Sequence, residues 1–139
     1  MRDSDIWSEE IRARVAQSLQ HISGLRQSLQ KRNIPLALCL IPYPWQFPGE
    51  NLVRKSQIGG WNEFAFPAGG LRDVIKEFSQ KSDIPLLDLY ETTSHYKEQF
   101  PDELLYCPSD PHWTVAGHQM AAKALLQFLP ELDLPMGEQ

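Results

Sequence analysis

Hydrophobic residues in the first quarter of the chain recur with the period of an α-helix. From residue 6 to about residue 32 they return at spacings of three, four and seven, so they share one face of a predicted amphipathic helix. Ser8 followed by two glutamates is typical of a helix start, because a hydroxyl caps the backbone there and acids face the positive helix end. The predicted apolar face consists of Trp7, Ile11, Val15, Ile22, Leu25 and Leu29.

Two continuous apolar runs follow, over residues 34–43 and 84–90, and such runs are typical of strands covered on both faces of a parallel sheet. Both runs start with nearly the same phrase, Gln-Lys-Arg-Asn-Ile-Pro-Leu and Gln-Lys-Ser-Asp-Ile-Pro-Leu, which we interpret as a helix end, a turn and a strand start used twice. The apolar stripe between the runs predicts a helix and therefore a strand–helix–strand unit with adjacent parallel strands, an α/β fold. That stripe consists of Leu71, Val74, Ile75 and Phe78.

Thr114 is predicted to cap a last helix that runs to Leu129, where Pro130 stops it. We expect one domain over residues 1–139 with a loose tail at 131–139. Two parallel strands are not stable alone, so we expect a missing N-terminal segment or a partner chain to complete the sheet, and an exposed apolar face where it would pack. The predicted buried side of the last helix is Ala121, Ala122, Leu125, Phe128 and Leu129.

Two irregular stretches, residues 44–70 and 91–113, are predicted to leave the carboxyl ends of the two strands. Ligands of open α/β sheets bind at that edge. The first stretch is rich in aromatic residues, which either line a carbohydrate platform or form the loop's own small core. They are Trp45, Phe47, Trp61, Phe64 and Phe66. Cys39, in the middle of the first strand, is predicted to lie in the core.

Composition narrows the function classes. The formal net charge of −5 disfavours a nucleic-acid binder, which normally carries a basic face. The longest nearly apolar run, residues 34–45, has about 12 residues, whereas a membrane span needs about 20. The first residues lack the apolar segment of a signal peptide. Two cysteines without a Cys-x-x-Cys pair predict neither a disulfide framework nor a zinc site.

The most informative chemistry is the pair Asp110 and His112 with a proline between them. Proline keeps the preceding residue extended, and alternate residues of an extended chain point to the same side. A carboxylate that fixes the histidine tautomer leaves the other ring nitrogen free as a general base. The helix that starts two residues later favours an ionised acid and a neutral imidazole. An ordinary loop pair is the alternative interpretation.

Neighbouring groups compete with this pair. His118 lies six residues beyond His112, which on a helix is roughly 240° around the axis, so the two rings do not share a metal ion. We expect His118 to be structural or to support the site from behind. Cys107 is expected to be a half-buried structural cysteine rather than a nucleophile. Asp88 either orients the histidine or is a solvated strand end.

Residues 110–118, Asp-Pro-His-Trp-Thr-Val-Ala-Gly-His, preceded by a strand ending Leu-Leu-Asp-Leu-Tyr, resemble the C-terminal block of SGNH (GDSL-type) hydrolases. This motif has one residue between the acid and the histidine, and a Trp follows the histidine. In this it is similar to the motif of the branch that includes alginate O-acetyltransferase-like and other exopolysaccharide-associated proteins. The phrase Ile-Pro-Tyr-Pro-Trp-Gln at 41–46 also resembles their strand exit. The resemblance covers roughly residues 7–129.

This resemblance implies a three-layer α/β/α sandwich with a parallel sheet, SGNH- or flavodoxin-like, incomplete here because the N-terminal strands are missing. It implies ester hydrolysis or O-acetyl transfer on acylated carbohydrate, with His112 as general base, Asp110 orienting it, and neither cofactor nor metal. Substrate contacts are expected at Tyr43, Trp45, Gln46 and Trp113.

The serine nucleophile of such enzymes lies in a Gly-Asp-Ser block, which this sequence lacks. The chain therefore resembles the C-terminal half of one and is expected to be inactive alone. Full-length relatives suggest the bacterial cell envelope. The alternative function is a non-catalytic polysaccharide-binding or pseudoenzyme module that presents the aromatic loop.

Overall fold

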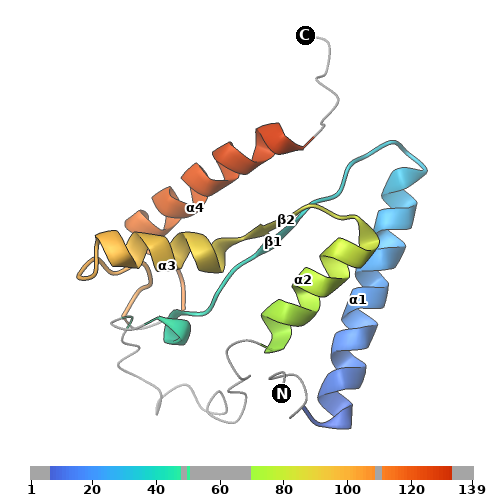
Figure 1. The fold of residues 1–139 in the computed structure, drawn as a ribbon, viewed down its shortest axis with the longest axis horizontal. Coiled ribbons are helices and arrows are strands. Elements are labelled where there is room, and N and C mark those ends of the chain that lie inside the picture. The colour runs from blue at the N-terminus through green and yellow to red at the C-terminus, as the bar shows by residue number, and fades with distance from the viewer. Residues whose placement is uncertain (1–6, 48–49, 51–69, 109–110, 133–139) are drawn as a thin grey trace. The chain divides into compact units, whose positions relative to one another are not determined.

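The computed structural model describes residues 7–47, 50, 70–108 and 111–132 (Figure 1). The chain forms two compact units, the first from residues 1–38 and 66–86 and the second from residues 39–65 and 87–139. The predicted tail starts at Glu131, the last residue of a 3-10 helix, η4 (Leu129–Glu131), and residues 133–139 lie outside the described part. No helix among the described residues is both long and apolar enough to cross a membrane.

The first unit contains the two predicted amphipathic helices, α1 (Glu9–Gln30) and α2 (Gly70–Ser82). Ser8 caps α1 as predicted, because its hydroxyl accepts a hydrogen bond of 3.3 Å from the amide of Ile11. Trp7, just before the cap, is buried, whereas no residue within α1 is buried. The apolar face of α1 is thus only partly covered by the described residues.

The repeated phrase forms the same turn twice, as predicted. Asn33 and Asp83 both have a left-handed backbone, with φ of 54° and 50°. After α1, the amide of Ile34 donates to the carbonyl of Leu29 at 3.0 Å, and after α2 the amide of Ile84 donates to the carbonyl of Ser79 at 3.0 Å. These six-to-one bonds are the Schellman motif, and among residues other than glycine Asn and Asp are those that adopt its left-handed position most readily.

The two apolar runs pair as parallel strands, β1 (Leu38–Leu40) and β2 (Leu86–Asp88), so the predicted adjacency is confirmed (Figure 1). Each strand is shorter than its apolar run. Cys39 is exposed, so its assignment to the core is wrong. Successive side chains of a strand alternate faces, and among the described residues the Cys39 face of this two-stranded sheet stays uncovered. The three-layer sandwich stays a prediction.

The second unit differs from the prediction after β2, where residues 91–99 are helical rather than irregular. The helix α3 (Leu89–Gln99) starts directly at the strand end. Asp88 caps it, because its carboxylate accepts from the amide of Tyr90 at 3.1 Å. Leu89 and Thr93, one turn apart, are buried and fix the helix on the core. Asp88 is therefore a helix cap at the strand end.

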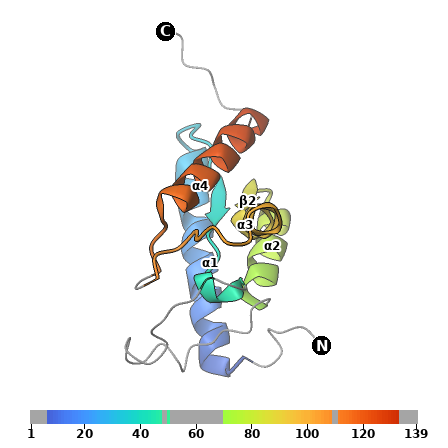
Figure 2. The ribbon, with the colours of Figure 1, turned by 90° about the vertical axis from the view of Figure 1, so that its left-hand side faces the viewer.

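The last helix, α4 (Val115–Phe128), packs against α3 (Figure 2, where α3 is seen end-on). Ala122, Leu125 and Leu129 are exposed, so three of the five residues predicted to be buried are wrong. The face that packs is narrower and made of small residues and one methionine, which let the helices approach closely. Its members are Gly117, Met120, Ala121 and Ala124.

The core of the second unit has two parts that share Trp113. One consists of Phe47, Leu105, Tyr106 and Met120, and Trp113 packs against it. The other consists of Leu89, Ala121 and Ala124, and Trp113 packs against that one as well. The residue after the predicted general base therefore lies between the two hydrophobic clusters.

Candidate functional site

Backbone hydrogen bonds join two short stretches around His112, the outgoing arm (residues 104–107) and the returning arm (residues 112–114). The amide of Cys107 donates to the carbonyl of His112 at 2.8 Å, and the amide of Thr114 donates to the carbonyl of Leu105 at 2.9 Å. Tyr106 and Trp113 form an antiparallel bridge between these bonds. His112 lies at the outer end of the returning arm and is exposed. Asp110 lies outside the described residues, so its distance to His112 stays a prediction.

Thr114 joins the returning arm to α4. Its hydroxyl donates to the carbonyl of Leu104 at 2.8 Å and accepts from the amide of Gly117 at 3.2 Å, which caps the helix. Gly117 is required by a close approach, since a Cβ there would lie 2.3 Å from the carbonyl oxygen of Leu105. The Thr-x-x-Gly spacing therefore ties the start of α4 to the outgoing arm.

Tyr106 connects the arms to the exit of β1. Its buried hydroxyl donates to the carbonyl of Pro42 at 2.7 Å. Burial raises the pKa of the Tyr106 phenol, and the Glu50 carboxylate raises it further while the Trp113 indole works in the opposite direction. The structure thus brings together the two segments that carry the predicted site residues, the β1 exit and the His112 arm.

The predicted substrate residues at that exit have different surroundings. Tyr43 is 42% exposed, and its amide donates at 2.7 Å to the side-chain oxygen of Gln46. This bond closes a short 3-10 helix, η2 (Pro44–Gln46), so Gln46 has a local structural contact. The side chain of Trp45 lies outside the described part of the chain. Trp113 is half-buried between the core clusters.

Phe47 is the aromatic of the 44–70 stretch whose environment is described. It is buried, and its ring lies 5.0 Å from the ring of Tyr90 between centroids. Phe47 is therefore part of the core of the second unit, where it packs with Leu105, Tyr106 and Met120, and it supports neither an open platform nor a core made by the loop alone. Trp61, Phe64 and Phe66 lie outside the described residues.

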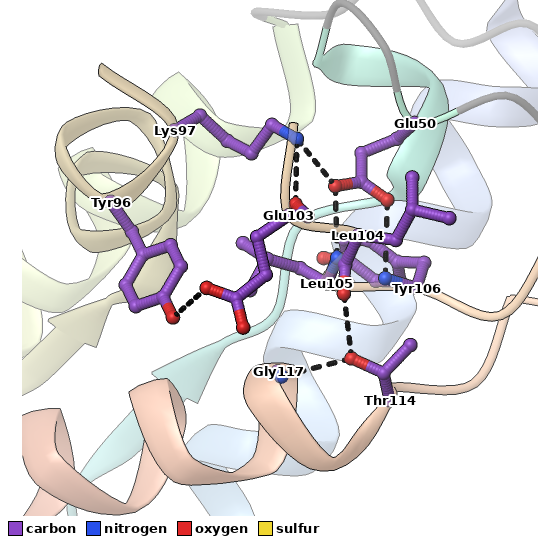
Figure 3. Close-up of polar contacts among 9 residues, drawn as sticks. All are labelled: Glu50, Tyr96, Lys97, Glu103, Leu104, Leu105, Tyr106, Thr114 and Gly117. Carbon is purple, nitrogen blue, oxygen red and sulfur yellow. Dashed lines mark hydrogen bonds and ion pairs between the residues drawn. The ribbon is translucent and has the colours of Figure 1, made fainter. Parts of the chain in front are cut away.

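Sequence reasoning missed a buried acid–base pair beneath the arms (Figure 3). Both oxygens of the Glu50 carboxylate accept backbone hydrogen bonds, from the amide of Leu105 at 3.0 Å and from that of Tyr106 at 3.1 Å. The Lys97 ammonium lies 3.1 Å from the same carboxylate and donates to the carbonyl of Glu103 at 2.9 Å. The side chains of Lys97 and Glu50 are 9% and 1% exposed. Nothing in the sequence spacing signals this pair.

The side chains of the two competing candidates, His118 and Cys107, both lie against Trp113. His118 is exposed, and its ring meets that of Trp113 edge-on at 5.6 Å between centroids. Cys107 is half-buried, and its thiol lies 3.8 Å from the carbonyl of Trp113. Within the described ranges, no three His, Cys, Asp or Glu side chains come together in a way that would hold a metal ion.

Comparison with known proteins gives one family match. A family model described as "SGNH hydrolase-like domain, acetyltransferase AlgX" matches residues 2–139. No curated protein and no solved structure matches the chain. The match covers both the β1 exit and the His112 arm.

Proposed function

Because the chain belongs to the SGNH hydrolase-like domain family of the acetyltransferase AlgX, we propose that it takes part in O-acyl ester chemistry on carbohydrate. The reaction is hydrolysis of an acyl ester or transfer of the acyl group to a sugar hydroxyl. His112 is the general base, and Asp110 orients it. The family also supports a larger parallel sheet, covered by helices on both faces, of which β1 and β2 are part.

One observation carries the proposal: His112 is exposed on an arm that is itself firmly anchored. The backbone around it is fixed by the Cys107 bond on one side and by the Thr114 cap of α4 on the other. A general base needs access to the reacting hydroxyl and a fixed position relative to it. The exposed Tyr43 lies at the β1 exit that Tyr106 joins to this arm, a position that suits contact with a sugar ring.

The proposed mechanism uses nucleophilic catalysis by a serine. His112 takes the proton of the serine hydroxyl while the serine oxygen attacks the acyl carbonyl, and the proton then passes to the departing alcohol. Water or a sugar hydroxyl, deprotonated by the same imidazole, releases the acyl group in the second half. The printed sequence has no Gly-Asp-Ser segment, so in this proposal the serine comes from outside these 139 residues.

Substitutions at three positions test the assignment in a preparation that includes the serine-bearing segment. His112→Ala should lower turnover of p-nitrophenyl acetate by roughly 10⁴-fold, because removing the base removes activation of the nucleophile. Asp110→Asn should cost as much or less, since it spoils the tautomer without deleting the base. His118→Ala is the matched control, because its ring stacks edge-on with Trp113 on α4, and it should change turnover little.

Two outcomes would contradict the assignment. Loss of activity in His118→Ala with full activity in His112→Ala would mean that the base is misidentified. If none of these variants alters turnover but Trp45→Ala abolishes binding to an acetylated polysaccharide, the chain is a binding module, the alternative that the exposed Tyr43 also favours. An in-frame Gly-Asp-Ser segment upstream of Met1 in the gene would support the enzymatic function.

A further inference from the structure

We infer that Glu50 is a positioning residue for His112, acting through the backbone of Leu105 and Tyr106. Its catalytic meaning rests on the function proposed for His112. The inference concerns the buried polar contacts of the arms, and it assigns a role to the Glu50–Lys97 pair of Figure 3.

The outgoing arm starts with a bend at residues 104–106, whose backbone amides and carbonyls are hydrogen-bonded to different partners. The consecutive amides of Leu105 and Tyr106 converge on the two oxygens of one carboxylate, at 3.0 and 3.1 Å. The carbonyls of Leu104 and Leu105 accept from the hydroxyl and the amide of Thr114, at 2.8 and 2.9 Å. Glu50 therefore holds the N–H side of this bend while Thr114 holds the carbonyl side.

Burial makes the carboxylate hard to replace. Leu105 is fully buried and Tyr106 is 3% exposed, so water cannot readily take over as acceptor for their amides. The charge of Glu50 is balanced by the Lys97 ammonium, which also bonds the carbonyl of Glu103 just before the bend. The Glu50–Lys97 ion pair therefore fixes the backbone of the bend without adding an exposed charge to the surface.

The hydrogen bonds between the two arms couple the position of the bend to the position of the His112 backbone. Leu105 and Cys107 of the outgoing arm are hydrogen-bonded to Thr114 and His112 of the returning arm. Since α4 holds the returning arm at Thr114, the Cys107 bond is the second fixed point of the His112 backbone. Loss of Glu50 would release the outgoing arm and with it this second point.

The test is nuclear magnetic resonance on the isotope-labelled 139-residue chain. In Glu50→Gln, which has one acceptor oxygen in place of two, amide exchange at Leu105 or Tyr106 should accelerate by about 10-fold or more, and the His112 imidazole signal should shift or split. Glu103→Gln is the matched control, because its exposed carboxylate bonds only the Tyr96 hydroxyl, at 2.6 Å, among the contacts described. It should leave both signals unchanged.

A second variant keeps the test decisive if Glu50→Gln fails to fold. Glu50→Asp retains the charge opposite Lys97 but withdraws the carboxylate by about 1.5 Å, the length of one C–C bond, so it cannot reach both amides. A displaced His112 signal in the folded variant supports the inference. A His112 signal at its wild-type position, with the amides of Leu105 and Tyr106 deprotected, would overturn it, because Glu50 would then stabilise the bend without positioning the histidine.

Turnover separates this inference from the proposed function. In a preparation competent for ester turnover, Glu50→Gln should lower kcat on the order of 10²-fold through misplacement of the base, with KM changed by no more than about twofold. If His112→Ala leaves turnover intact, the proposed function fails, while the resonance signals still report whether Glu50 positions His112. If His112→Ala abolishes turnover but Glu50→Gln leaves kcat unchanged, the positioning role fails and the general base stands.

Discussion

Replacement of Gly117 by alanine tests how closely the start of α4 is fitted to the outgoing arm. An alanine Cβ at this position would lie 2.3 Å from the carbonyl oxygen of Leu105 and 3.0 Å from Cβ and Cγ of Trp113. The Leu105 carbonyl is a backbone group bonded to the amide of Thr114 at 2.9 Å. Rotation of a side chain cannot relieve that contact, so either the arm or the helix has to move.

The expected magnitude follows from two opposing terms. Alanine is favoured over glycine within a helix by about 1 kcal/mol, whereas overpacking in a closely packed region costs roughly 1–3 kcal/mol and more where backbone is involved. We expect a net destabilisation of about 1–2 kcal/mol, which lowers Tm by roughly 4–8 °C in a domain of this size. Gly24→Ala in α1 is the matched control, since nothing lies within 4 Å of a Cβ there, and it should raise Tm by roughly 2–4 °C.

Thermal unfolding followed by circular dichroism at 222 nm measures both variants. The result that would refute the reasoning is an equal rise of Tm in Gly24→Ala and Gly117→Ala, because helix propensity alone would then explain both. A fall of Tm in both variants would contradict the open surroundings of Gly24.

Two further predictions concern a buried phenol and an exposed helix face. Tyr106→Phe removes the bond to the Pro42 carbonyl and should cost about 1 kcal/mol at neutral pH. The pKa of Tyr106 is raised in the folded state, so its contribution to the free energy of unfolding is complete below the unfolded pKa of about 10 and is lost as the pH rises through the folded pKa. Urea midpoints measured between pH 7 and 11 should therefore fall less steeply with pH in the variant than in the wild type. An unaltered slope would contradict this. Leu126 and Val115, 69% and 74% exposed, lie on the same side of α4, roughly 16 Å apart along its axis. Leu126→Lys should change stability by less than about 0.5 kcal/mol and lower the fluorescence of a bound hydrophobic dye. Unchanged dye binding would mean that this face is not the apolar surface expected of the isolated chain.

The elements that the sequence predicted best are those specified by neighbouring residues. The repeated phrase ending at Leu36 and Leu86 predicted two equivalent turns, and Asn33 and Asp83 adopt the same left-handed backbone. Thr114 was predicted as the cap of the last helix from its place before the apolar stripe, and its hydroxyl does cap it. Caps and turns depend on a few adjacent residues, so local chemistry is sufficient to predict them.

The misses arise where the decisive contact is distant in sequence. Asp88 ends β2, as one of its two interpretations predicts, but its role as the cap of α3 is not signalled by the sequence. The weak apolar pattern of Leu89 and Thr93 becomes a helix face only against the core. The predicted buried side of α4 includes Ala121 correctly, but Ala122 and Leu125 are exposed. The helix packs instead through Gly117, Met120 and Ala124, positions that are selected only by contact with the core.

Sequence patterns do not predict the contacts that anchor the His112 arm. Glu50 bonds an amide 55 residues away, and its charge partner comes from a helix that was itself not predicted. A single glutamate in a loop has the same appearance whether it is solvated or buried. The proposal that Asp110 and His112 act as a pair rests on a motif; His112 is accessible on a bonded arm, while the position of Asp110 stays a prediction.

The pairing of Cys107 with His112 has a consequence for how this segment tolerates changes in chain length. Residues 104–107 and 112–117 are held by the Glu50 carboxylate, by hydrogen bonds to each other and by the helix cap. Loop tips absorb insertions and deletions far better than hydrogen-bonded backbone does. An insertion between His112 and Gly117 would therefore shift the histidine ring off its anchor at the cap of α4.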